Sequence, residues 1–157
     1  MGKRRDLIIR RLTNEGESAL EFFRGLDEAG WDRRIYAEGS RWTLRQVLCH
    51  FISIESGLLR LARDVLDGGE GAPKDLDVDE FNEREVRAMA GSAPSDLLPE
   101  FERLRADMVE LVRGLDEADL EREGRHPVLG RISLEKLLKL VYRHNMMHLR
   151  DVRRVLS

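Results

Sequence analysis

The helical periodicity of apolar residues is the feature that most constrains how this chain of 157 residues can fold. Apolar side chains recur every three or four positions in four long segments, and no segment shows the alternation of a half-buried strand. These segments cover residues 4–26, 43–66, 95–115 and 132–156. Each predicted helix has one apolar stripe, and the chain has no predicted sheet for the helices to cover. The helices therefore bury these stripes against one another. The pattern therefore predicts an all-α fold, a four-helix bundle that forms a single domain over residues 1–157.

The connectors between the predicted helices differ in character. Residues 27–41 include Trp31 and Tyr36, two large side chains that we expect to fold back over one end of the bundle. The next connector is rich in Gly and Asp and then gives a short extra helix over residues 79–89, between the second and third long helices. Residues 114–130 hold several turn-forming residues, and the pattern there predicts a short turn of helix over Glu117–Glu121 followed by an irregular loop.

Residues that favour helix starts mark the beginning of three long helices. Thr43 is a suitable N-cap for the second helix, with Ser40 as a competitor for that position. Ser95 is expected to cap the third helix, which places Pro99 in the first turn, where proline is tolerated. Ser133 is expected to cap the last helix.

Charge and composition exclude several classes of function. The 27 basic and 30 acidic residues give a net charge of −3, which offers no general attraction to nucleic acid. Basic clusters at residues 3–5 and 10–11 have acidic neighbours and no interleaved aromatic residues, so we interpret them as a solvated helix face. No apolar run approaches the roughly 20 residues of a membrane span, and no secretory signal is visible. The single cysteine, Cys49, excludes an intrachain disulfide and favours a cytoplasmic location.

Two histidines on the last helix form the first candidate site. His144 and His148 are four residues apart, so they lie on one face, in the apolar stripe that includes Leu137, Val141 and Val152. Burying two imidazoles without hydrogen-bond partners is unfavourable, and a metal ion would satisfy both. Bonding to water or to other side chains would satisfy them as well, and both interpretations stay open at this point.

A third histidine on the second helix extends this pair. A bundle can bring His50 beside His144 and His148, and three imidazoles with an open fourth position are typical of catalytic zinc sites. Nickel, cobalt, iron and copper also accept imidazole ligands, so the residues do not choose the metal. Asn145 stands where a zinc protease of the His-Glu-x-x-His type has its glutamate, which argues against that activity. His126 precedes a proline in a loop, and we expect it to pack there rather than bind metal.

These residues together resemble a known family. The run from Trp42 to His50 (Trp-Thr-Leu-Arg-Gln-Val-Leu-Cys-His), followed by Glu55 and a C-terminal His144-x-x-x-His148, is similar to the DinB-like superfamily. That group includes the bacillithiol transferases and the N-terminal domain of mycothiol-dependent maleylpyruvate isomerase. The resemblance covers essentially the whole chain and implies an up-down-down-up bundle. It also implies a divalent metal, with zinc or nickel as the first expectation, held by the three histidines.

The resemblance further implies thiol chemistry, with a metal-dependent transferase or isomerase activating a low-molecular-weight thiol toward an electrophile. Two alternatives are a metal-binding stress-response protein without turnover and a metal-dependent hydrolase. The expected partners are therefore a small-molecule thiol and an electrophile, with no nucleic acid and no membrane, and a homodimer is neither required nor excluded.

Several polar residues lie close to the candidate ligands in the predicted helices. Asp151 could orient an imidazole, or it could be a solvated acid near the helix end. Gln46, Ser53 and Asn82 could line a substrate cleft, or they could be ordinary polar surface. Glu55 falls inside an apolar stripe and needs a basic partner, a hydrogen-bond donor or solvent. Cys49 is expected to pack as a small apolar group beside His50, rather than to act as a ligand or nucleophile.

Overall fold

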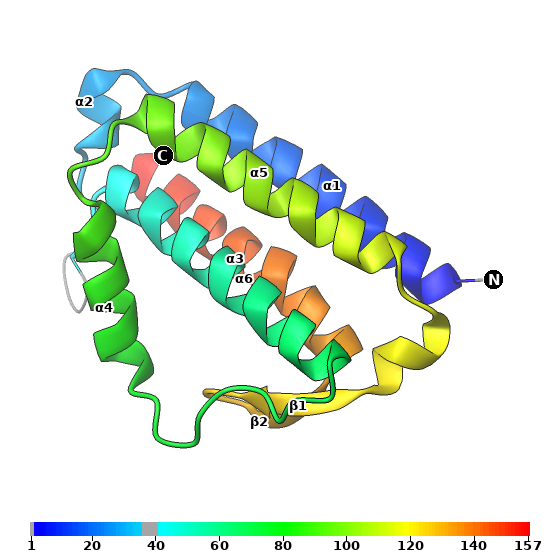
Figure 1. The fold of residues 1–157 in the computed structure, drawn as a ribbon. Coiled ribbons are helices and arrows are strands. Elements are labelled where there is room, and N and C mark those ends of the chain that lie inside the picture. The colour runs from blue at the N-terminus through cyan, green and yellow to red at the C-terminus, as the bar shows by residue number, and fades with distance from the viewer. Residues whose placement is uncertain (1, 36–40) are drawn as a thin grey trace.

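Four long helices form the body of the protein (Figure 1). The computed structural model describes residues 2–35 and 41–157, so Tyr36 and Ser40 lie outside the described residues. The long helices are α1 (Lys3–Arg24), α3 (Leu44–Leu66), α5 (Pro94–Arg113) and α6 (Leu134–Leu156). Helix α1 packs against α5 and α6, and α3 packs against the same two helices. The predicted four-helix bundle is confirmed.

The direction of the helices follows the predicted up-down-down-up order. Along the colour gradient of Figure 1, α1 and α6 run one way, and α3 and α5 run the other way. Because α3 and α5 are parallel, the chain has to cross the length of the bundle between them. Helix α4 (Val78–Met89) and its flanking loops make that crossing, and α4 is the short extra helix that the sequence predicts.

The connector before α6 agrees with the sequence-based expectation in its first part and differs from it in its second part. It contains a 3-10 helix, η1 (Glu117–Glu121), and an antiparallel hairpin of β1 (Glu123–His126) and β2 (Gly130–Ser133). The predicted turn of helix over Glu117–Glu121 is confirmed, whereas the prediction of an irregular loop without strands after it was wrong. Each strand has four residues, which is too short for alternation to be recognised in the sequence.

Side-chain N-caps mark the beginning of two of the long helices. Thr43 caps α3 in a capping box with Gln46, and Ser133 accepts a hydrogen bond from the backbone of Lys136 at the start of α6. The expected cap at Ser95 was wrong, because α5 begins at Pro94, whose fixed φ suits the first helical position. Pro99 therefore lies inside α5 and not in its first turn.

The core between the helices is apolar and continuous. Helix α2 (Glu28–Trp31) follows α1, and its buried Trp31 stacks on Phe23 with 5.6 Å between ring centroids, as expected for a residue that closes one end of the bundle. Val155 has the helical spacing of the apolar stripe on α6, but it is 44% exposed near the end of the helix. Within residues 2–35 and 41–157, no helix combines the length and apolar character that crossing a membrane requires.

Candidate metal centre

Three histidines from two helices converge inside the bundle. His50 comes from α3, and His144 and His148 come from α6. The Nε2 atoms of His50 and His144 are 3.0 Å apart, and one ring nitrogen from each of the three residues lies within 4.8 Å of the others. The packing of α3 against α6 thus brings together residues that are 94 positions apart in the chain.

Aromatic side chains surround this cluster. The ring centroid of Trp42, which lies just before the N-cap of α3, is 4.5 Å from that of His50. The ring centroid of Phe51 is 5.9 Å from that of His144 and 6.0 Å from that of His148. His50 is only 4% exposed. The capping box at Thr43 begins α3 two turns before His50, so a local backbone signal fixes the position of this imidazole.

Burial keeps the three imidazoles neutral. It lowers the pKa of His50 to about 2, with a further contribution from the two neighbouring histidines. Burial likewise lowers the pKa of His144 to about 4 and also lowers that of His148, where the nearby Asp151 acts in the opposite direction. Neutral imidazoles keep a lone pair on one ring nitrogen, which is the state that binds a cation. The donor set and its protonation therefore fit a metal ion.

Asn145 fixes the orientation of one of these rings. The Nδ1 atom of His144 lies 3.1 Å from Oδ1 of Asn145, and Nδ2 of Asn145 donates to Oε1 of Glu15 at 3.3 Å. With its amide in this orientation, Oδ1 of Asn145 accepts a hydrogen bond from Nδ1–H of His144, which leaves the lone pair of that ring on Nε2, facing His50. Asn145 itself is 1% exposed, so the amide is held in place.

A buried ion-pair network lies behind Asn145. Arg105 on α5 donates through Nε and an Nη atom to both carboxylate oxygens of Glu55, at 2.8 and 2.9 Å, and pairs with Glu15 at 2.8 Å. It also donates to the backbone carbonyl of Leu12. Burial raises the pKa of Glu15 despite the opposing effect of Arg105. Burial disfavours the charge of Arg105, but the two carboxylates together raise its pKa.

This network gives Glu55 the basic partner that its place in an apolar stripe requires. Glu55 therefore supports the helix packing and does not reach the histidines directly. Arg105 and Glu15 were missed by the sequence reasoning. The available signal was a charged residue on the buried face of each helix, between Leu104 and Met108 on α5 and between Leu12 and Ala19 on α1.

A cavity of about 780 Å³ opens beside the histidine cluster. His50 and His144 form part of its wall, and most of the rest is apolar. Ser53 and Asn82 also line it, and among the described residues Ser53 Oγ and Asn82 Oδ1 are buried without a hydrogen-bond partner. The apolar wall includes Ile54, Leu58, Leu61, Leu76, Phe81 and Leu140.

The other polar residues singled out in the sequence have different places. The side chain of Gln46 forms the capping box with Thr43 and does not line the cavity. Asp151 is half-buried, and its charge acts on His148 from outside the cavity. Cys49 is fully buried, and burial raises the pKa of its thiol to about 11, as expected for a packing residue. His126 accepts hydrogen bonds from the backbone N–H groups of Val128 and Leu129, so its side chain stabilises the turn between β1 and β2. It also lines the cavity.

Solved structures share this fold at low sequence identity. Mycothiol-dependent maleylpyruvate isomerase superposes with a TM-score of 0.79 at 15% identity, over 94% of this chain and 60% of its own. This chain therefore spans less than two thirds of that protein. YfiT from Bacillus subtilis, described as a probable metal-dependent hydrolase with an unusual four-helix bundle topology, superposes with a TM-score of 0.74 at 20% identity, over 96% and 85% of the two chains. An uncharacterized protein from Clostridium difficile 630 superposes with a TM-score of 0.72 at 12% identity, over 97% of this chain and 98% of its own.

At the level of sequence, no curated protein matches the chain. The sequence model of the DinB superfamily, in contrast, matches residues 11–152, which include the whole of α3 and α5, most of α1 and α6, and the three clustered histidines. The chain therefore belongs to the DinB superfamily.

Proposed function

We propose that His50, His144 and His148 hold one divalent cation, zinc or nickel, at which a low-molecular-weight thiol is activated for transfer to an electrophile or for an isomerisation. The observation that carries this proposal is the convergence of three neutral imidazoles within 4.8 Å, two of which, those of His50 and His144, line a large apolar cavity. Three histidines leave a coordination position open, as catalytic sites require. The mycothiol dependence of the structurally similar isomerase supports a thiol as the co-substrate.

The protein's own residues have defined tasks in this proposal. The three histidines are ligands and do not exchange protons with the substrate, and Asn145 keeps the lone pair of His144 directed at the cation. A bound divalent cation would supply a thiolate at neutral pH, where a free thiol with a pKa of about 8.5 is mostly protonated.

The cavity indicates which electrophiles would fit. Its volume of about 780 Å³ lies within the range of ligand pockets, roughly 300–1,000 Å³. The apolar wall favours an uncharged substrate with an aliphatic or aromatic body. Ser53 and Asn82 offer a hydroxyl group and an amide oxygen that have no partner in the protein, so they are suited to a polar group on that substrate.

Metal-dependent hydrolysis is the second candidate, and the structural similarity to YfiT supports it. Both activities need the same three ligands, but only the first requires a thiol. Cytoplasmic location and a homodimer stay predictions, to be tested by cell fractionation and by analytical ultracentrifugation.

Metal content and thiol dependence test the proposal together. Elemental analysis of protein purified without an affinity tag should find about one zinc or nickel per chain, and His148→Ala should lose it. The protein should then accelerate the loss of 1-chloro-2,4-dinitrobenzene in the presence of a low-molecular-weight thiol, and this acceleration should disappear in His148→Ala. His126→Asn is the matched control, because His126 lines the same cavity outside the cluster and Asn keeps a hydrogen-bond acceptor.

Three results separate the alternatives. Equal thiol-dependent turnover in His148→Ala and the unmodified protein would contradict the metal-thiol proposal. Turnover of ester or amide substrates without thiol, lost in the same variant, would favour the hydrolase. Stoichiometric metal with neither activity, across a panel of thiols and electrophiles, would leave a metal-binding protein without catalysis.

A further inference from the structure

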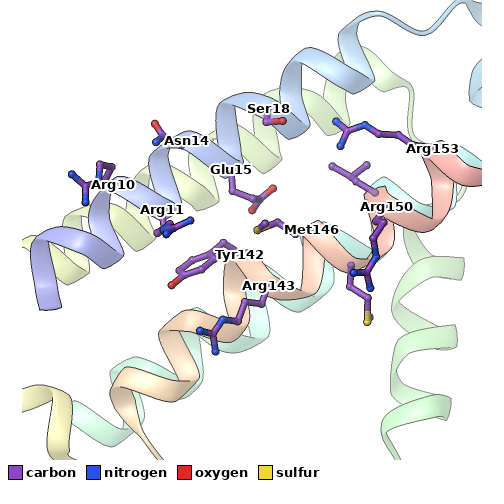
Figure 2. Close-up of a pocket in the computed structure, with 12 residues that line it drawn as sticks. Arg10, Arg11, Asn14, Glu15, Ser18, Tyr142, Arg143, Met146, Arg150 and Arg153 are labelled. Carbon is purple, nitrogen blue, oxygen red and sulfur yellow. The ribbon is translucent and has the colours of Figure 1, made fainter.

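A second cavity, of about 680 Å³, lies between α1 and α6, and it is strongly basic. Figure 2 shows two of its arginines on α1 and three on α6, with the carboxylate of Glu15 in the space between the helices. The sequence shows only half of this surface, because residues 10 and 11 look like an isolated basic pair until α6 is placed beside them. The five groove arginines are Arg10, Arg11, Arg143, Arg150 and Arg153.

The groove arginines have no acidic partners. Elsewhere in the protein, exposed arginines such as Arg103 and Arg113 form ion pairs with neighbouring carboxylates. Among the described residues, no carboxylate lies within ion-pair distance of any groove arginine, although Arg153 lies over the ring of Phe22. Glu15 is the single acid in the lining; its Oε1 atom is bonded to Arg105 and Asn145, and its Oε2 atom is buried without a hydrogen-bond partner.

This arrangement is unfavourable for the protein alone and favourable for an anionic ligand. A chain with a net charge of −3 has acidic residues available, yet five positive charges gather in one groove and repel one another. A bound polyanion would remove that repulsion. Guanidinium groups present paired N–H donors that match the oxygen geometry of a phosphate group, and arginine is preferred over lysine wherever such paired contacts matter.

The shape of the groove limits the size of the ligand. Its volume suits a small molecule, and its two walls are helices that already pack against each other. Met146 and Met147 are 52% and 45% exposed and, with Tyr142, give the groove an apolar part. Methionine adapts to ligands of different shape, so the groove can contact a ring or a hydrocarbon body as well as charges.

We propose that the groove between α1 and α6 binds a soluble small molecule that carries at least two phosphate groups on a partly apolar body. This site is separate from the histidine cluster and does not depend on the function proposed for that cluster.

Inorganic diphosphate is the probe for this site, titrated into the purified protein by isothermal calorimetry at about 0.15 M chloride. The test variant is Arg11→Gln/Arg150→Gln, which removes two exposed guanidinium groups that have no partner in the described structure. The matched control is Arg103→Gln/Arg113→Gln, which changes the net charge equally on α5. Saturable binding should weaken at least about tenfold in the test variant and less than about twofold in the control.

Three further measurements can overturn the proposal. Absence of saturable binding, or equal weakening in both double variants, would show that the groove has no specific affinity for phosphate groups. Loss of diphosphate binding in His148→Ala, with full binding retained in Arg11→Gln/Arg150→Gln, would place the diphosphate at the metal centre instead. Cosedimentation with phosphatidylglycerol vesicles that is lost in the groove variant would identify a lipid headgroup rather than a soluble ligand.

The oligomeric state provides the last test. If analytical ultracentrifugation shows a dimer that Arg11→Gln/Arg150→Gln converts to a monomer, the groove is an interface between two copies and the proposed ligand site is wrong. An unchanged sedimentation coefficient in the groove variant, together with the tenfold loss of diphosphate affinity, supports the ligand site.

Discussion

Replacing Arg105 with methionine is the most informative single perturbation of this fold. Arg105 is 5% exposed, and its partners Glu15 and Glu55 are 7% and 1% exposed, so all three charges lie in the core. Methionine keeps the unbranched apolar stem and removes the guanidinium group. The variant would hold two buried carboxylates without a counter-charge and would leave the carbonyl of Leu12 without one of its donors.

The expected loss of stability is large. Removing one member of a buried ion pair costs about 3–5 kcal/mol, whereas the unfolding free energy of a typical domain is about 5–15 kcal/mol. For a chain of this length, about 1 kcal/mol shifts the midpoint of thermal unfolding by roughly 2–4 °C, so a shift of about 10 °C is expected. Arg103→Met is the control, since Arg103 is exposed and solvent screens its ion pairs, so the midpoint of thermal unfolding should change little.

The loss should also depend on pH. Burial already raises the pKa of Glu15, and removing the positive charge of Arg105 would raise it further above the unfolded value of about 4.3. A carboxyl group with a raised pKa in the folded state destabilises the protein at high pH and less so as the pH falls toward the unfolded pKa. The difference in unfolding free energy between Arg105→Met and the unmodified protein should therefore become smaller as the pH falls from 7.5 to about 5.

Urea unfolding followed by circular dichroism at several pH values measures this difference. A loss below about 1 kcal/mol, or a loss that does not change with pH, would refute the view that Arg105 neutralises buried carboxylates. A triple variant, Glu15→Leu/Glu55→Leu/Arg105→Met, should recover most of the stability, because replacing a whole buried ion network by apolar residues is often neutral or stabilising.

Three other predictions concern the histidine cluster and Cys49, which adjoins His50 in the chain. Metal-free protein should lose stability as the pH falls below about 6.5, because the unfolded chain protonates its histidines while burial keeps the pKa of His144 near about 4; a flat urea-unfolding profile from pH 7 to 4.5 would contradict this. Asn145→Leu should weaken metal binding by about 10–100-fold in a competition titration with a chelating dye, and an unchanged affinity would show that Asn145 does not orient His144. Cys49 should resist iodoacetamide in the native protein and react after unfolding in urea, as judged by mass spectrometry, and rapid native labelling would show that the thiol is accessible.

Much of the fold could be read from the sequence because it depends on local patterns. Helical periodicity located the four long helices, and the hydroxyl side chains of Thr43 and Ser133 marked the start of two of them. The failures have local causes too. Ser95 looked like a cap, but Pro94 immediately before it is better suited to the first helical position, and the β1–β2 hairpin is too short to leave a pattern.

The site was only partly predictable, because its supporting residues depend on contacts between helices. The histidines were identifiable because imidazoles on an apolar stripe need an explanation. Glu55 raised the same question, but its partner lies 50 residues away, and the sequence alone does not say which cation on which helix faces it. The arginine groove shows the same limit, since Arg11 and Arg150 become neighbours of one cavity only when α1 packs against α6.

Position 145 shows why a motif is weaker evidence than a placed side chain. In the sequence, Asn145 argues against a protease because it replaces the glutamate of His-Glu-x-x-His. In the structure, this side chain is 1% exposed and contacts Glu15 on α1, whereas the cavity lies on the side of His50 and His144. A glutamate here would meet the carboxylate of Glu15 and would not reach a substrate in the cavity. Helix α6 therefore uses one face to present ligands and the adjacent face to anchor them to the buried ion network, and this division of roles, more than the identity of residue 145, excludes a base at that position.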